Sequence, residues 1–129
     1  MAEALATGRL QRLRPSMPAA GDLVNRARMH LSSAGLIADN DPSLAMSACH
    51  DAARQAISAH MRATGYRATA EAGAHRLVIE YASSACSGRL FWPAGRLGRR
   101  AQHRRSDRSQ ALSGACWHAS RLIALAAGM

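Results

Sequence analysis

The densest set of side chains that can bind a ligand is a run of arginines near the C-terminal end of the chain. Five fall within ten residues: Arg99, Arg100, Arg104, Arg105 and Arg108. A guanidinium group binds phosphate through two parallel hydrogen bonds, so this run predicts nucleic-acid binding. Trp92 and Trp117 can add stacking surfaces for RNA bases. The alternative interpretation, favoured on composition, is a solvated basic tail that binds polyanions without selectivity.

Histidine and cysteine do not form a recognisable site. His50 and His60 are ten residues apart, so they lack the spacing of metal ligands on one helix face, and His60 falls on an apolar stripe. The three cysteines, Cys49, Cys86 and Cys116, are odd in number and widely spaced. We therefore predict reduced, mostly buried thiols in a cytoplasmic protein, with no metal and no cofactor.

The charge is concentrated in the last third of the chain. The 129 residues include 17 arginines, no lysine and 8 acidic residues, for a net charge of +9, and residues 85–129 hold +7 of it. Alanine occurs 29 times, whereas Leu, Ile, Val and Phe together number only 20. This composition excludes a large core and a multidomain enzyme, and the apolar run 122–127 is too short to cross a bilayer. Residues 1–20, with Arg9, Arg12 and Arg14, are predicted to form a mobile basic arm.

The elements that must position these side chains are helices. Apolar residues recur every three to four positions over 22–34, 42–64 and 75–85, and Gly35 and Gly65 are placed to end the first two helices. Asp41 is the expected N-cap of the second helix, with Pro42 at its first position. Asp51 and Arg54 lie three residues apart on that helix and can form a local ion pair. No strand is expected between residues 20 and 85.

Three domains or segments follow from these patterns: a basic arm (1–20), a helical segment (21–85) and an Arg-rich, poorly ordered C-terminal region (86–129). In the last region only Ala119–Ala127 is predicted to be helical. The fold class is therefore all-α, an antiparallel helical bundle with basic ends.

The helical segment resembles the HEPN superfamily, in particular its small actinobacterial members. Three stretches carry the resemblance: ARMHLSSAGLIADNDPSLA, HDAARQAISAHMRATGYR and GAHRLVIEY. The resemblance implies an antiparallel bundle of four or five helices that is commonly a homodimer. Members are often metal-independent RNA endonucleases, frequently toxins paired with a nucleotidyltransferase-type antitoxin, and others are inactive binding modules.

The resemblance also implies a catalytic pair late in the bundle, an Arg and a His with four to six residues between them. The Arg would stabilise charge on the scissile phosphate, and the His would act as general acid or base on the ribose 2′-hydroxyl or the leaving oxygen. The late match is Arg96 and His103, with six residues between them. Leu97 stands where the family has a polar residue, and Gly95 and Gly98 disfavour a helix there.

Three functional interpretations follow. The leading one is a HEPN-domain protein related to toxin-type RNA endonucleases but without a competent active site; if it is active, it is a metal-independent RNA endonuclease. The second is a small nucleic-acid-binding protein that acts through the Arg-rich C-terminal region. The third is a non-functional product of a degraded gene, in which the composition break near residue 85 marks a shift of reading frame.

Overall fold

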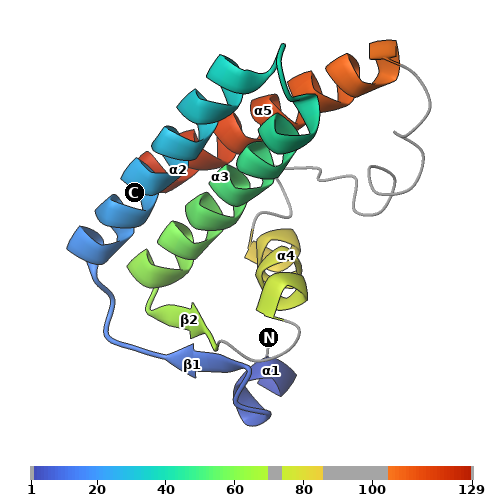
Figure 1. The fold of residues 1–129 in the computed structure, drawn as a ribbon. Helices are drawn as coiled ribbons and strands as arrows, with labels where there is room; N and C mark the ends of the chain where they lie inside the picture. The colour runs from blue at the N-terminus through green and yellow to red at the C-terminus, as the bar shows by residue number, and fades with distance from the viewer. Residues whose placement is uncertain (1, 70–73, 86–104, 129) are drawn as a thin grey trace.

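The computed structural model describes residues 2–69, 74–85 and 105–128. In these ranges the chain is predominantly helical, which confirms the all-α fold class. The elements in chain order are α1 (Ala2–Ala6), β1 (Leu10–Arg12), α2 (Met17–Ile37), α3 (Pro42–Ala63), β2 (Tyr66–Ala68), α4 (Ala74–Ala85) and α5 (Arg105–Ala127). Helices α2 and α3 form an antiparallel hairpin, α5 packs behind them, and β1, β2, α1 and α4 lie toward one end (Figure 1).

Local signals in the sequence start both helices of the hairpin. Asp41 is the N-cap of α3, as predicted, and its Oδ1 accepts a hydrogen bond of 2.9 Å from the backbone N–H of Leu44. Helix α2 is longer at both ends than the sequence predicted. It begins at Met17, because the Oγ of Ser16 caps it by accepting from the N–H of Ala19 at 3.3 Å, and it runs through Gly35, which was expected to end it.

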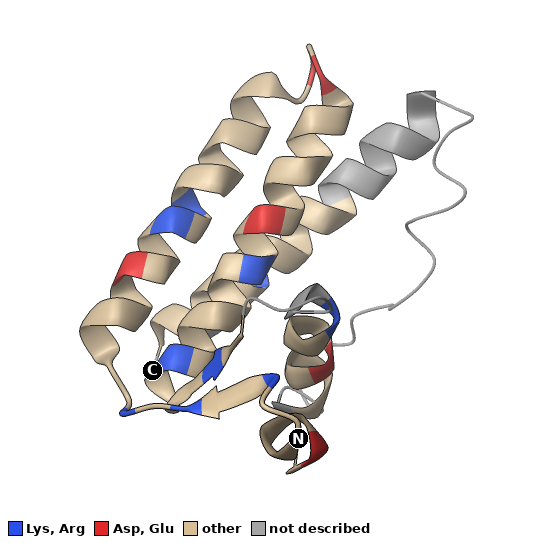
Figure 2. Cartoon of the chain, turned by 60° about the horizontal axis from the view of Figure 1, so that its bottom comes forward, with Lys and Arg blue, Asp and Glu red and all other residues tan. Residues whose placement is uncertain are grey.

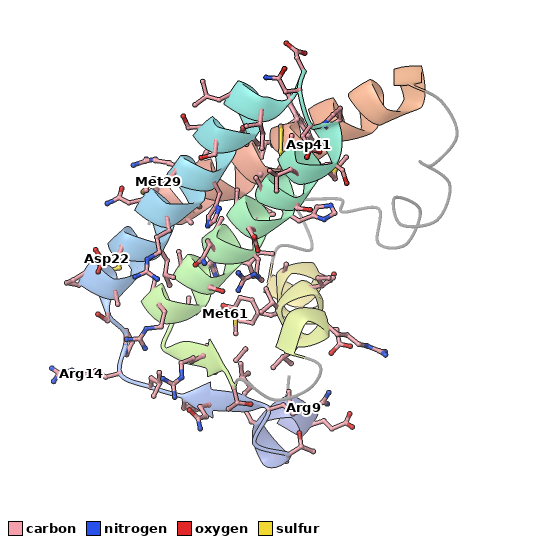
Figure 3. All side chains as sticks on the ribbon, in the orientation of Figure 1. Arg9, Arg14, Asp22, Met29, Asp41 and Met61 are labelled. Carbon is pink, nitrogen blue, oxygen red and sulfur yellow. A yellow bond between two sulfur atoms is a disulfide. The ribbon has the colours of Figure 1, made fainter. Side chains whose placement is uncertain are left out.

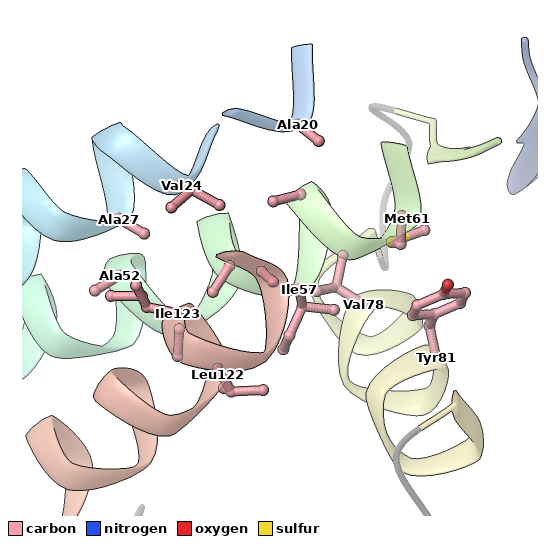
Figure 4. Close-up of a cluster of buried hydrophobic side chains, with 14 of the residues drawn as sticks. Ala20, Val24, Ala27, Ala52, Ile57, Met61, Val78, Tyr81, Leu122 and Ile123 are labelled. Carbon is pink, nitrogen blue, oxygen red and sulfur yellow. The ribbon is translucent and has the colours of Figure 1, made fainter. Parts of the chain in front are cut away.

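The interface between α2, α3 and α5 is built mainly from alanine. Six alanines have no exposed surface at all: Ala27, Ala34, Ala45, Ala52, Ala59 and Ala119. Larger side chains such as Val24, Ile57 and Ile123 fill the space between them (Figure 4). Because a methyl group is the smallest side chain that still excludes water, the backbones can approach closely and bury the hairpin without bulky residues.

Helix α5 overturns the prediction of a short helix confined to Ala119–Ala127. It begins 14 residues earlier, at Arg105, so the prediction of an irregular C-terminal region is wrong for this part of the chain. Its buried residues recur at helical spacing and face α2 and α3: Ala115, Ala119, Leu122, Ile123 and Ala126. This apolar stripe supplies the third wall of the core.

A two-stranded antiparallel sheet joins the N-terminal segment to the end of α3, so the prediction that no strand lies between residues 20 and 85 is wrong for β2. Leu10 pairs with Ala68, Gln11 with Arg67 and Arg12 with Tyr66. Gly65, predicted to end α3, makes the turn into β2 with φ = +84°, and a Cβ there would lie 2.8 Å from the carbonyl oxygen of Leu13. Only glycine fits both this backbone conformation and this close approach.

Cys49 of α3 and Cys116 of α5 are joined by a disulfide, with their Cα atoms 5.3 Å apart. The prediction of reduced thiols is therefore wrong for these two residues. The bond closes a loop of 67 residues and attaches α5 covalently to the hairpin.

We expect this bond to stabilise the fold. The disulfide lowers the conformational entropy of the unfolded chain, and replacing Cys116 by Ser restores that entropy. We therefore expect C116S to lower the free energy of unfolding by about 4 kcal/mol. Urea denaturation followed by circular dichroism measures the change. Cys86→Ser is the matched control, since it removes a thiol that is not in the bond. Equal stability of C116S and C86S would contradict the expectation.

Candidate nucleic-acid interface

The short sheet carries a concentration of positive charge. We call the segments 9–14 and 62–69 the basic ribbon. They contain Arg9, Arg12, Arg14, Arg62 and Arg67 and no acidic residue. In Figure 2 the ribbon bears blue segments and no red ones, and in Figure 3 Arg9 and Arg14 lie at opposite ends of its first segment. The two segments of the ribbon thus carry only positive charge, although the helical segment as a whole is close to neutral.

Backbone hydrogen bonds hold both segments of the ribbon in place. The N–H of Leu13 donates to the carbonyl of Gly65 at 2.9 Å, that of Ser16 to Arg62 at 3.1 Å, and that of Thr69 to Arg9 at 3.0 Å. The prediction of a mobile basic arm over residues 1–20 is therefore wrong for residues 9–16. Their arginines are presented from a paired backbone, which lowers the entropic cost of binding a ligand.

Two side-chain contacts connect the strands across the ribbon. The guanidinium of Arg12 lies 5.9 Å from the ring centroid of Tyr66, its cross-strand partner. Arg67 Nη2 donates a hydrogen bond of 2.9 Å to Gln11 Oε1. Both arginines are exposed and keep donors free for a further partner, because a guanidinium has five N–H groups.

A hollow of about 370 Å³ lies beside the ribbon. Arg54, Ser58 and Arg62 line it from α3, where their spacing of four residues places them on one helix face. Arg67 and Thr69 line it from the β2 side. Its apolar wall consists of Leu23, Met61 and Val78, contributed by α2, α3 and α4. We call this hollow the basic pocket.

The basic pocket has more positive charge than its neighbours neutralise. Arg54 Nη2 lies 3.1 Å from Asp51 Oδ1, which confirms the predicted ion pair, and both side chains remain about 40% exposed. Arg62 differs, since its Nη1 is buried and no acceptor among the described residues bonds to it. A buried guanidinium N–H without a partner is costly unless a ligand or water satisfies it. An anion is the ligand that matches this donor.

Most of the candidate site residues named from the sequence lie in α5 or outside the residues that the structure describes. Arg96, His103, Arg99, Arg100 and Arg104, together with Trp92, fall in residues 86–104, which the structure does not describe. Arg105 and Arg108 lie in the first turn of α5, and their side chains are outside the described part. The catalytic pair and the arginine run therefore stay predictions.

Sequence reasoning missed the pocket, although one signal for it was present. Arg54, Ser58 and Arg62 form a polar stripe with a four-residue repeat along an otherwise alanine-rich helix. The contribution of Arg67 and Thr69 could not be predicted, because no strand was expected between residues 20 and 85. In the described part of the chain, no group of histidine, cysteine and acidic residues could hold a metal ion, and no helix is long and apolar enough to cross a membrane.

His60 lies near this region but belongs to the packing between α3 and α4. Its Nδ1 is 2.9 Å from the hydroxyl of Tyr81, which is also 2.9 Å from the hydroxyl of Thr64. Burial lowers the pKa of His60 below its usual value of 6.5, because desolvation disfavours the charged imidazolium. This arrangement agrees with the position of His60 on the apolar stripe of the sequence.

The comparisons with known proteins leave the family open. A scan against protein-family models finds no match, and neither a search of curated proteins nor one of solved structures finds one. The HEPN resemblance therefore rests on the three sequence stretches alone.

The depressed pKa of His60 predicts how stability depends on pH. In the folded state this group binds its proton less readily than in the unfolded state, so its contribution to stability is complete above pH 6.5 and is lost as the pH falls through the folded pKa. We expect the free energy of unfolding to decrease between about pH 7 and pH 5.

The variant His60→Gln should flatten this part of the profile, since it keeps a polar side chain that does not titrate. His50→Gln is the control, because His50 is exposed on the same helix. Urea denaturation at a series of pH values measures both variants. A profile that flattens in H50Q rather than in H60Q would show that another group causes the dependence.

Proposed function

We propose that this chain is a HEPN-type helical protein that binds RNA through its basic ribbon and does not cleave it. The observation that carries the proposal is the ribbon itself: five arginines on two paired segments without an acidic residue. Phosphate contacts dominate the affinity of proteins for nucleic acid, and paired strands present arginines in a fixed geometry. The proposal moves the binding surface from the C-terminal arginine run to the paired segments 9–14 and 62–69.

The composition of the basic pocket supports binding rather than cleavage. Among the residues that the structure describes, its lining includes three arginines but no histidine, aspartate or glutamate. Cleavage of RNA without a metal needs a general base within hydrogen-bond reach of the 2′-hydroxyl. The histidine nearest in sequence, His60, bonds to Tyr81 and faces apolar residues such as Leu122 and Ala126. The arginines can therefore hold a phosphate. The described lining offers no carboxylate or imidazole beside them for proton transfer.

The resemblance extends the proposal to partners and compartment. A homodimer and a nucleotidyltransferase-type antitoxin are the protein partners that HEPN toxins imply, and the proposal includes both. It also includes a cytoplasmic location, where RNA is abundant. The Cys49–Cys116 disulfide is the feature that argues against this compartment, since structural disulfides are rare there.

Removal of ribbon charge should weaken RNA binding in a salt-dependent way. We expect the triple variant Arg9→Ala, Arg12→Ala, Arg14→Ala to lower the slope of log K against log salt by about 2, because each phosphate contact to single-stranded RNA contributes about 0.7. Fluorescence anisotropy with a labelled single-stranded RNA at several salt concentrations measures the slope.

The matched control removes the same charge from another surface. Arg26→Ala, Arg28→Ala and Arg76→Ala together change three exposed arginines on α2 and α4. The slope should change little in this variant if the ribbon is the binding surface. Equal losses in both triple variants would point to non-selective attraction by net charge and would contradict the proposal.

RNA should remain intact in the presence of the protein. We expect the labelled RNA to be cut no faster by the parent chain than by Arg96→Ala or His103→Ala, because Leu97 and two glycines interrupt the motif. Denaturing gel electrophoresis after long incubation with and without chelator measures cleavage. Metal-independent cleavage by the parent that both variants lose would assign the catalytic role to this pair and overturn the claim of inactivity.

A further inference from the structure

The basic pocket differs from the ribbon surface in one respect: it is a hollow that both charged and apolar side chains line. Arg54, Arg62 and Arg67 provide three guanidinium groups, and Ser58 and Thr69 add hydroxyls. Leu23, Met61 and Val78 line the same hollow, and Met61 and Val78 are almost fully buried. This is the polarity of a site for a small ligand that carries an anionic group on an apolar body.

The size of the pocket limits what can enter. Its volume of about 370 Å³ falls at the lower end of the range of small-molecule sites, which is roughly 300–1,000 Å³. A single nucleotide is of this order of size, whereas a continuous strand that enters and leaves would need an open channel. The pocket therefore suits one nucleotide, either free or at the end of a chain.

The charge of the pocket indicates which phosphate is bound. A phosphate within an RNA strand is a diester with one negative charge, whereas a terminal phosphomonoester carries about −1.5 to −2 at pH 7 and has three oxygens that accept hydrogen bonds. Three guanidinium groups line the pocket, and of these Arg54 pairs with a carboxylate, that of Asp51. The excess of positive charge and the unpartnered Nη1 of Arg62 match the monoester better than the diester.

We infer that the basic pocket binds the phosphomonoester of a single nucleotide, with the phosphate on Arg54, Arg62 and Arg67 and the nucleoside against Leu23, Met61 and Val78. The inference rests on the proposed function for its ligand class, since it makes the pocket an end-recognition subsite beside the RNA-binding ribbon. The same chemistry is present in a free nucleoside monophosphate and in the phosphorylated terminus of an RNA strand. Binding measurements distinguish these two sources.

The experiment compares four ligands with the full chain by isothermal titration calorimetry at fixed salt. They are a short RNA with a 5′-phosphate, the same RNA with a 3′-phosphate, the same RNA with two hydroxyl ends, and adenosine 5′-monophosphate. We expect one of the two phosphorylated RNAs to bind at least tenfold more tightly than the hydroxyl form. The monophosphate alone should bind more weakly than that RNA if the strand is the source, and equally if the free nucleotide is.

Two variants test whether the pocket is responsible. Arg62→Met removes the charge and keeps most of the aliphatic packing, and Ser58→Leu fills the hollow without changing any charge. Both should abolish the gain from the phosphate. Ser58→Leu should leave the affinity for hydroxyl-ended RNA within about twofold, whereas Arg62→Met also removes a charge of the basic ribbon and should lower that affinity. Arg76→Ala is the matched control, because this exposed arginine lies outside the pocket and pairs with Glu80. Circular dichroism checks that each variant is folded. If R62M does not fold, S58L alone tests the pocket.

The outcomes separate this inference from the proposed function. If hydroxyl-ended RNA binds but neither phosphate adds affinity, the pocket inference is overturned and the RNA-binding proposal remains. If the monophosphate binds in a way that R62M and S58L abolish, while no RNA binds, the pocket inference stands and the RNA-binding proposal is overturned. A phosphate gain that persists in both variants places the phosphate elsewhere and overturns the inference.

Discussion

Close approach of helices through alanine is the constraint on which the rest of this structure depends. Helix α3 lies at the centre and contacts α2, α5, α4 and β2. Its buried face is mostly alanine, from Ala45 to Ala59, so its neighbours approach to short distances. Each alanine removes little apolar surface from water, at about 0.8 kcal/mol per buried CH₂, and the core has few large side chains to add to it. Additional links between the elements, a covalent one at Cys49 and a hydrogen-bonded one at the ribbon, therefore matter more than in a domain with a bulky core.

The same constraint decides where polar side chains can lie. Neighbouring elements cover α3 on several sides, and none of its polar residues is fully buried. Arg54, Ser58 and Arg62 form a partly exposed polar stripe along one face of the helix. The ribbon then closes the end of the stripe with Arg67, and α2 and α4 provide its apolar wall. A basic pocket thus arises where four elements meet, although each element contributes only one to a few of its residues.

The parts of the fold that could be predicted from sequence depend on local signals. The start of α3 at Pro42, its end at Gly65 and the ion pair between Asp51 and Arg54 follow from residues a few positions apart, and all are confirmed. Helix α5 was underestimated because its stripe consists largely of alanine and is interrupted by Gly114 and Trp117, which weaken the helical pattern. The disulfide could not be deduced, since spacing along the chain does not determine which cysteines meet in space.

The basic ribbon could not be predicted from the sequence for a different reason. Its strands are three residues long, too short for an alternating pattern, and their partners are separated by more than 50 residues. The candidate site depends on this pairing, because it brings Arg67 and Arg12 to the end of α3. A site assembled from residues of distant segments has no motif in the sequence, even when each of its side chains is of an informative type.

The pairing of Leu10 with Ala68 also bears on the order in which the molecule assembles. The hairpin of α2 and α3 forms from neighbouring residues and can collapse early, whereas the ribbon closes a loop that spans the entire hairpin. Its entropy of closure is repaid only after α2 and α3 have packed and brought the two segments together. The basic ribbon therefore forms late in folding. In partly folded chains its arginines are not yet brought together on one surface.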